Sequence, residues 1–372
     1  MRIGVDARWL SKPNPSGIGV YLKEVLTRLN QKEDGNEYFL FSNKPFADGI
    51  PRGPRFHEVL IPGKIGSLWI LRELAAKLPD YHLDVFWGPE HVLPRGLRGV
   101  RKVVTIHDIA LMIHPSWGSR YNALIQNTLV RYSIRKADVI LADSKSTKKD
   151  LVTRLRVKPE KVKGIYPGRN ELPAYTAQEE QEMMSRILSP SPYILYIGTL
   201  EPRKNIVSII RAFDLLKEDS RYAQYRLVLA GGLGWRYGEI LKAIGESPYR
   251  EDIIRPGYVS EVEKSILLHK AKAFLFPSLY EGFGFPIVEA VSAGIPVITA
   301  RNSSLPEAAG PAESYVERAD DVEMICDTLR QVLDLKKEER AARNAASRKY
   351  IRRFNWDRCV TQIETVLGQT PV

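Results

Sequence analysis

The chain has 372 residues, a length that favours two domains over one because single hydrophobic cores rarely grow that large. Its two cysteines, Cys326 and Cys359, have no cysteine or histidine at metal-ligand spacing, which argues against a disulfide framework and a zinc site. Residues 1–8 already read as a strand, and no uncharged apolar run of about 18 residues occurs. We therefore expect a cytoplasmic protein without a membrane-spanning helix.

The net charge of +11 is unevenly distributed along the chain. Residues 1–172 carry 29 Lys and Arg against 17 Asp and Glu, whereas residues 173–372 carry 26 against 27. A basic first half is compatible with nucleic acid, an anionic membrane surface or a polyanionic substrate, because all three respond to the same long-range field. Charge alone does not choose among them.

The first half contains short β-branched and aromatic runs that alternate with helix-like segments. These runs predict strands at 2–7, 37–42, 83–88, 103–108 and 139–144. Such alternation is typical of a doubly wound parallel sheet, whose ligands bind beyond the carboxyl ends of the strands. The residues that follow each strand are therefore the candidates for a site.

Several strand ends of the first half carry candidate residues. Gly17 and Gly19 follow the first strand and open a helix, but the third glycine of a dinucleotide fingerprint is missing, so a tight β-to-α turn explains them equally well. Trp87 ends the third strand, and His107 with Asp108 ends the fourth. A strand-end histidine is as compatible with a structural role as with a catalytic one.

Two segments of the first half combine positive charge with helical patterning. Residues 64–78 carry Lys64, Arg72 and Lys77 beside large apolar residues at helical spacing. This segment predicts either a helix lying on an anionic membrane or an ordinary helix with Trp69 in the core. Residues 145–163 contain eight Lys and Arg, enough for electrostatic attraction to lipid phosphates.

A polar stretch between about Gly168 and Pro192, broken by prolines, predicts the linker between two domains. We place the first domain at 1–172 and the second at 173–354. Residues 355–372 predict one last amphipathic helix, which could pack back on the first domain or across the second.

The second half has predicted strands at 193–198, 226–231, 252–257, 273–278 and 296–300, followed by segments rich in glycine and charge. That rim suits a nucleotide diphosphate, which needs close backbone approach, N–H donors and positive charge. Arg203 and Lys204 follow the first of these strands and precede a helix near Asn205, where they would stabilise a diphosphate leaving group. A solvated basic loop is the alternative.

The segment YEGFGFPIVEAVSAG places Glu281 and Glu289 eight positions apart. Gly282 and Gly284 permit positive φ, and Pro286 fits the first turn of a helix. Both carboxylates could accept hydrogen bonds from the vicinal hydroxyls of a sugar or ribose. Taken alone, a capping acid and a surface acid would explain the pair as well.

The segments GTLEPRKN, GGLGW, GYVS, PSLYEGFGFPIVEA and SSLPEAAG together closely resemble the family 4 retaining glycosyltransferases. The resemblance covers nearly the whole chain, is strongest over 193–310, and includes GIGVYL, VVTIHD, LADSKSTKKDL and FNWD. Glu281 and Glu289 match the E-x7-E motif of that family. The resemblance implies the α/β fold called GT-B, in which two Rossmann-like, doubly wound domains face each other across a cleft. It also implies that the first domain binds the acceptor and the second the nucleotide-sugar donor.

The resemblance implies a role for each matching position. Glu281 would hold the donor hexose, Glu289 the ribose, Arg203 and Lys204 the diphosphate, and His107 the transferred sugar. These catalytic positions are joined by the expected donor contacts Gly17, Gly19, Gly198, Tyr258, Val259, Gly282, Phe283, Gly284, Phe285 and Glu289, and by the expected acceptor contacts Gly17, Trp87 and Asp108.

We expect transfer with retention and without metal or other cofactor, since no Asp-x-Asp triplet occurs to hold a divalent cation against a diphosphate. Neither glutamate is assigned as a nucleophile. Front-face attack, in which the leaving phosphate oxygen takes the acceptor proton, requires positioning and electrostatics but no protein base.

Two departures from the general family pattern bear on the donor. Tyr166, Pro167 and Gly168 stand where many members have P-N-G, and the basic pair is set in LEPRKN. The latter variant resembles the mannosyltransferase and rhamnosyltransferase branches, so GDP-mannose is the first expected donor. The expected acceptor is a glycan or lipid-linked saccharide of cell-surface polysaccharide or glycolipid synthesis. UDP- or dTDP-sugars carrying glucose, N-acetylglucosamine or rhamnose are alternatives.

Three other classes of protein compete with this interpretation. A nicotinamide oxidoreductase would need the missing third glycine and a ribose-binding acid after the second strand. A nucleic-acid partner is not expected, because no aromatic residues interleave with the basic ones in a known recognition motif. A non-catalytic protein that binds sugar nucleotides would keep the fold and lose turnover. Peripheral membrane association through the basic first domain remains an additional expectation.

Overall fold

The computed structural model describes residues 1–12, 17–32, 34–47, 53–63, 66–187 and 191–369. Lys64, Pro190 and residues 370–372, which were part of predicted segments, lie outside these ranges. The chain forms two compact units, the first from Met1–Gly168 and Phe354–Val372, the second from Arg169–Arg353. The structural boundary thus follows Gly168 rather than residue 172.

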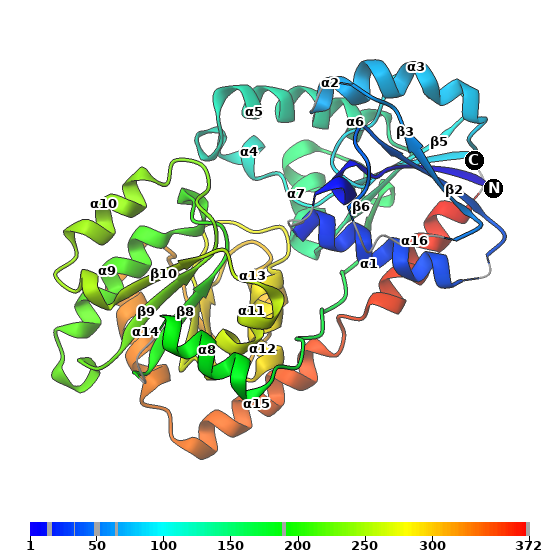
Figure 1. Ribbon diagram of the computed structural model, residues 1–372. Coiled ribbons are helices and arrows are strands. Elements are labelled where there is room, and N and C mark those ends of the chain that lie inside the picture. The colour runs from blue at the N-terminus through cyan, green and yellow to red at the C-terminus, as the bar shows by residue number, and fades with distance from the viewer. Residues whose placement is uncertain (13–16, 33, 48–52, 64–65, 188–190, 370–372) are drawn as a thin grey trace. The chain divides into compact units, whose positions relative to one another are not determined.

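The first unit is built on a seven-stranded parallel sheet with the order β3-β2-β1-β4-β5-β6-β7 (Figure 1). Its strands are β1 (Arg2–Asp6), β2 (Glu37–Ser42), β3 (Phe56–Leu60), β4 (Val85–Gly88), β5 (Arg101–Ile106), β6 (Val139–Ala142) and β7 (Val162–Gly164). Its helices are α1 (Gly17–Gln31), α2 (Ser67–Trp69), α3 (Ala75–Lys77), α4 (Ala110–Ile113), α5 (Arg120–Ile125), α6 (Arg131–Lys136), α7 (Lys145–Leu155) and α16 (Trp356–Gly368).

The second unit contains a six-stranded parallel sheet with the order β10-β9-β8-β11-β12-β13. Its strands are β8 (Tyr193–Ile197), β9 (Arg226–Ala230), β10 (Ile253–Gly257), β11 (Ala273–Phe276), β12 (Val297–Ala300) and β13 (Ser314–Val316). Its helices are α8 (Ala177–Ile187), α9 (Ile206–Lys217), α10 (Gly238–Glu246), α11 (Glu261–Lys270), α12 (Phe285–Ala293), α13 (Leu305–Ala309), α14 (Val322–Leu333) and α15 (Lys337–Ile351).

In each sheet the strands that come first in the sequence lie in the middle, and later strands were added outward on both sides. The direction of winding changes between β1 and β4 in the first sheet and between β8 and β11 in the second. This is the doubly wound arrangement expected from the alternating pattern. The central strands are buried on both faces, as the runs of apolar residues predicted; every residue of β4, β8 and β11 is buried. Three strands that the sequence pattern did not predict, β3, β7 and β13, all lie at sheet edges.

Two predicted segments differ from the structure. The polar stretch taken as a linker contains α8, which packs on α11 through the ion pair of Glu180 with Lys270 at 2.6 Å. In the segment 64–78, Trp69, Ile70 and Leu74 are buried, and the Trp69 indole N–H donates to the Ile61 carbonyl at 2.8 Å. The apolar side of that segment therefore belongs to the core of the first unit.

The last helix, α16, returns to the first unit and lies beside α1 (Figure 1). Arg28 pairs with Asp357 at 3.1 Å, and Lys32 pairs with Glu364. The last helix was predicted to pack either on the first domain or across the second. Its described part, α16, packs on the first. Within the described part of the chain, no helix is long and apolar enough to cross a membrane.

Candidate functional site

The backbones of the loops after β8 and β9 are in close contact at the carboxyl edge of the second sheet. Gly231 has φ of +140°, and a Cβ there would come within 2.0 Å of the Gly198 carbonyl oxygen. Gly198 has φ of +153°. A side chain at Gly231 would push the two loops apart, whereas one at Gly198 would meet the Tyr196 hydroxyl at 2.7 Å, so Gly231 sets how closely the strand ends approach.

Four charged side chains gather where β8 and β11, neighbours in the sheet, end. Arg203 and Lys204 lie on the short turn Pro202–Lys204 after β8, and Glu281 follows β11. The Arg203 guanidinium donates to Glu281 Oε2 at 3.0 Å and to Glu201 Oε1 at 2.8 Å. Lys204 Nζ donates to Glu281 Oε1 at 2.5 Å. We call Glu201, Arg203, Lys204 and Glu281 the charged cluster.

Burial and charge act in opposite directions on the charged cluster. Burial by itself would raise the pKa of Glu281, but Lys204 and Arg203 outweigh it and lower that pKa to about 2. Burial, together with the charge of Arg203, lowers the pKa of Lys204 in spite of Glu281. The carboxylate is therefore ionised throughout the physiological range, and its charge is shared between two cations.

Glycine and serine residues hold Glu281 in its loop. Gly284 has φ of +108° and precedes α12, whereas Gly282 does not have a positive φ. The Glu281 backbone N–H donates to Ser303 Oγ at 3.0 Å, and the Ser304 hydroxyl donates to the Glu281 and Phe283 carbonyls at 2.9 Å each. The loop is thus tied to the segment after β12.

Glu289 lies in α12 and is 6% exposed. Lys264 of α11 donates to Glu289 Oε1 at 2.9 Å and also pairs with Glu261 at 2.8 Å. Burial raises the pKa of Glu289 even though Lys264 opposes the effect. The second glutamate of the motif therefore has its own cation, separate from the charged cluster.

The other predicted donor contacts of the second unit differ in exposure. Tyr258 is 61% exposed at the end of β10, whereas Val259 and Phe283 are buried. Phe285 is half-buried and meets Phe283 edge to face at 5.1 Å. Among these, the Tyr258 ring has the largest surface open to a ligand.

His107 lies at the carboxyl edge of the first sheet and is buried. Its Nδ1 is 2.5 Å from Asp143 Oδ2, and its Nε2 is 2.7 Å from the Pro89 carbonyl oxygen. Both ring nitrogens therefore have partners within the protein. The predicted contact with a transferred sugar would require one of them to exchange its partner.

The remaining predictions for the first unit have mixed outcomes. Trp87 is fully buried in β4, and its indole N–H donates to Thr105 Oγ1 at 2.9 Å. Its side chain lies in the core rather than beyond the strand end, so the predicted acceptor contact is corrected. Asp108 accepts from the Ala110 N–H at 2.8 Å. Gly17 and Gly19 open α1, but residues 13–16 of their loop lie outside the described part.

Sequence reasoning missed Glu201, Lys264 and Asp143 as members of these sites. Glu201 stands within GTLEPRKN and Asp143 within LADSKSTKKDL, so each lay inside a segment already singled out. Lys264 is on α11, outside every such segment, and no signal in the sequence points to it. No group of three or more His, Cys, Asp or Glu among the described residues could hold a metal ion.

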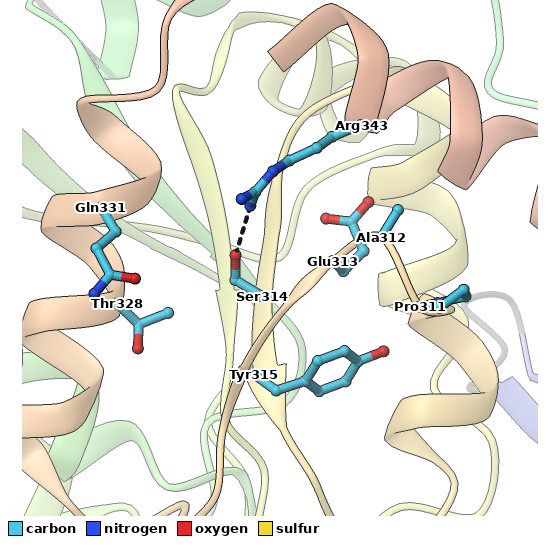
Figure 2. A pocket seen from close by; sticks show the side chains of 8 residues that line it. All are labelled: Pro311, Ala312, Glu313, Ser314, Tyr315, Thr328, Gln331 and Arg343. Atoms are coloured by element: carbon cyan, nitrogen blue, oxygen red, sulfur yellow. Dashed lines mark hydrogen bonds between the residues drawn. The ribbon is translucent and has the colours of Figure 1, made fainter. Parts of the chain in front are cut away.

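A surface hollow of about 410 Å³ lies apart from the charged cluster, between β13, α14 and α15 (Figure 2). Tyr315, Thr328 and Arg343 line it, and the Arg343 guanidinium donates to Ser314 Oγ at 3.3 Å. Ser314 begins β13, so the hollow is at the amino end of that strand. It does not share residues with the predicted site.

Comparison with known proteins decides the family. A family model described as "Glycosyl transferases group 1" matches residues 178–349, and one described as "Glycosyltransferase Family 4" matches residues 15–171. The O-antigen chain mannosyltransferase B of Escherichia coli is 32% identical over 367 residues, which are 93% of this chain and 94% of that protein. The chain is a family 4 glycosyltransferase.

One further relative and one solved structure are similar to this glycosyltransferase. The serotype-specific mannosyltransferase WbdA of Escherichia coli is 28% identical over 218 residues, 56% of this glycosyltransferase and 26% of WbdA, so the match spans about a quarter of WbdA. The structure of sucrose-phosphate synthase from Thermosynechococcus elongatus superposes with a TM-score of 0.78 at 16% identity, covering 98% of both chains. The predicted α/β GT-B fold class of this glycosyltransferase is confirmed.

Proposed function

We propose that this glycosyltransferase moves mannose from GDP-mannose to a saccharide or lipid-linked acceptor during synthesis of a cell-surface polysaccharide. The observation that carries the proposal is the charged cluster, which stands at the strand ends where a doubly wound domain binds its nucleotide. The choice of mannose is supported by the names of the relatives, O-antigen chain mannosyltransferase B and WbdA.

The cluster suits a donor that brings its own negative charge. The side chains of Arg203 and Lys204 are 19% and 12% exposed, and Glu281 now serves as their counter-ion. A diphosphate would supply oxygens to both cations, which would free Glu281 to accept hydrogen bonds from hexose hydroxyls. Glu289, held by Lys264, would take the ribose in the same way.

We further propose that transfer retains the anomeric configuration and needs no metal ion. Arg203 and Lys204 would offset the charge that grows on the departing diphosphate, and the leaving phosphate oxygen would take the acceptor proton. Treatment with a chelator should leave the rate of transfer unchanged, and the product should carry an α-linkage when the donor is GDP-α-mannose.

The donor is tested by thermal unfolding in the presence of GDP-mannose, UDP-glucose, UDP-N-acetylglucosamine and dTDP-rhamnose. A ligand that binds only the folded state raises the melting temperature by mass action. GDP-mannose should give the largest shift. If another nucleotide sugar gives a larger shift, that sugar would replace GDP-mannose as the proposed donor. Binding without transfer or donor hydrolysis would favour the non-catalytic alternative.

The site is tested with the double variant Arg203→Ala, Lys204→Ala. Losing charge stabilisation of the leaving group should lower kcat by about 100-fold or more, since a single lost oxyanion donor already costs that much. The matched control is Arg250→Ala, Lys242→Ala, whose side chains are exposed on the same unit. Equal activity of the two double variants, both confirmed as folded, would remove the charged cluster from the mechanism.

We also propose peripheral binding to anionic membranes through the basic segment 145–163. The segment begins with α7 and presents Lys145, Lys149, Arg154, Arg156, Lys158 and Lys163 on the surface of the first unit. Trp69, Ile70 and Leu74 of segment 64–78 are buried and not available for this role, although Leu68 is 51% exposed. Flotation with phosphatidylglycerol vesicles should show binding that falls as salt rises. Equal flotation with neutral vesicles would contradict the proposal.

A further inference from the structure

Three neighbouring strand ends of the first sheet meet around the His107 ring. Pro89 follows β4, His107 follows β5 and Asp143 follows β6, and these strands are adjacent in the sheet. The Asp143 carboxylate and the Pro89 carbonyl each face one ring nitrogen, at 2.5 Å and 2.7 Å. The Thr147 hydroxyl of α7 donates to the His107 carbonyl at 3.1 Å. The segment from Asp143 to Thr147 therefore holds both the ring and the backbone of His107, and Pro89 holds the other side of the ring.

The geometry determines which ring nitrogens carry protons. A backbone carbonyl only accepts, so Nε2 must be an N–H donor to Pro89. The Asp143 carboxylate directly precedes Ser144, the N-cap of α7, where the helix dipole favours negative charge. An ionised carboxylate also only accepts, so Nδ1 must donate as well. With a proton on each nitrogen, the ring is an imidazolium.

His91 contrasts with His107. Its Nε2 accepts the backbone N–H of His107 at 3.1 Å, so that nitrogen carries no proton and the His91 ring is neutral. The two rings lie 5.4 Å apart. The proton is therefore assigned to one histidine of the pair, the one that faces a carboxylate.

The other titratable groups around His107 come from four places. Tyr21 of α1 meets the ring edge-on at 5.3 Å, and burial raises its pKa well above the ordinary value. Burial also raises the pKa of Cys359 on α16, which is close to Tyr21 and Asp143. Glu90 and Asp108 act on the ring only through their charge. Burial alone would lower the pKa of His107, but Asp143 outweighs it and raises that pKa.

We propose that Asp143 is a positioning residue that keeps His107 charged, so that His107 acts in glycosyl transfer as a hydrogen-bond donor and not as a general base. This proposal rests on the proposed function and specifies the role that His107 has in it. A base needs a free lone pair on Nε2, and this nitrogen instead carries a proton held by the Pro89 carbonyl. A hydroxyl oxygen of the substrate can replace that carbonyl as acceptor without any change in protonation.

The charge state is tested without substrate by an NMR titration of protein labelled with ¹⁵N in the histidine rings. The His107 signals, assigned by their loss in His107→Gln, should remain those of an imidazolium above pH 6.5, the ordinary pKa of histidine. Asp143→Asn should lower the pKa of His107, whereas Asp80→Asn, an exposed aspartate of the same unit, should not change it. A neutral His107 at pH 6 in the unmodified protein would overturn the proposal.

The role is tested by the pH profile of kcat/KM. For a donor, activity should fall about tenfold per pH unit once pH exceeds the pKa of His107, whereas for a base it should rise with pH up to that pKa and then level off. Asp143→Asn should move the fall to lower pH and recover activity in acid. A uniform loss of activity at every pH would reduce Asp143 to a structural residue. If this variant does not fold, the pH profile of the unmodified protein still decides between donor and base.

Failure of the proposed function would instead show as no transfer from GDP-mannose with an unchanged histidine titration.

Discussion

At the scale of single residues, Glu281, for which we propose a role in donor binding, also stabilises the unit that carries it. Its carboxylate is 9% exposed and bonds to both Arg203 and Lys204. Ion pairs at this depth are costly to break on one side, because the remaining charge is left without a partner. The charged cluster, which we propose as the donor site, therefore also contributes to the folding energy of the second unit.

Glu281→Gln should destabilise the protein at pH 7 by about 3 kcal/mol, since the variant removes the carboxylate that pairs with Lys204 and leaves Arg203 with Glu201 alone. The folded-state pKa of about 2 lies below the ordinary 4.5, so this stabilisation is complete above pH 4.5 and is lost as pH falls toward 2. Urea unfolding at pH 7 and pH 3 should show the difference between protein and variant shrinking in acid.

The matched substitution is Glu317→Gln, whose ion pair with Arg301 is exposed on the same unit. It should change the free energy of unfolding by no more than about 1 kcal/mol at either pH, because solvent screens an exposed pair. A loss in Glu281→Gln that is equally large at pH 3 would show that packing, and not charge, holds Glu281.

At the scale of elements, the start of α12 is set by Gly284, which precedes the helix in a left-handed conformation. Gly284 has φ of +108°, Pro286 lies in the first turn, and Gly294 ends the helix with φ of +80°. The positive φ of Gly284 and the place of Pro286 match the sequence prediction, and Gly294 adds the left-handed glycine that commonly ends a helix. The helix start places Glu281 before α12 and Glu289 within it.

Gly284→Ala should cost about 1–3 kcal/mol of stability, because a Cβ is strained at this φ and would lie 3.3 Å from the Ala308 Cβ. The displaced loop should also weaken donor binding, measured by titration calorimetry with GDP-mannose. Gly245→Ala in α10 is the control: its Cβ meets nothing within 4 Å, and it should stabilise by about 0.5–1 kcal/mol. Stability unchanged in Gly284→Ala would mean that the loop does not need a left-handed residue.

At the scale of the whole molecule, the chain leaves the first unit after Gly168 and returns to it at Phe354. Trp356 and Ile363 of the returning segment are buried, and a Cβ at Gly168 would lie 2.2 Å from the Trp356 ring. The first unit is thus completed by a segment that follows the whole second unit in the sequence. Its core depends on contacts between segments that lie on either side of the second unit in the sequence.

Ile363→Ala should destabilise the first unit by about 2–5 kcal/mol, through the cavity that it leaves beneath α16. Hydrogen exchange should quicken in α1 and β1 while β8 and β11 keep their protection. Gln362→Ala, on the exposed side of the same helix, should stay within about 0.5 kcal/mol. Faster exchange spread equally over both units would contradict the assignment of α16 to the first.

Most strands that could be predicted from sequence are buried on both faces; the exception is β10, a partly buried edge strand. YILYI and AFLF are unbroken apolar runs because helices cover both sides of their sheet. The edge strands β3, β7 and β13 were missed: only Phe56 of FHEVL is buried, and VKG and SYV have only three residues each. An edge strand pairs on one side only, so its sequence is less constrained.

The sequence by itself determined the doubly wound class, the two-domain division and the strand ends at which charge collects, because these follow from local patterns of apolar, glycine and charged residues. Only the tertiary structure decided which strand ends meet. Arg203 and Glu281 are 78 positions apart, and His107 and Asp143 are 36 apart; each pair forms because strand order brings two loops together. The same order buried Trp87, which the sequence placed at a site. A parallel sheet positions functional residues by the order of its strands, and that order is not written in any one segment of the chain.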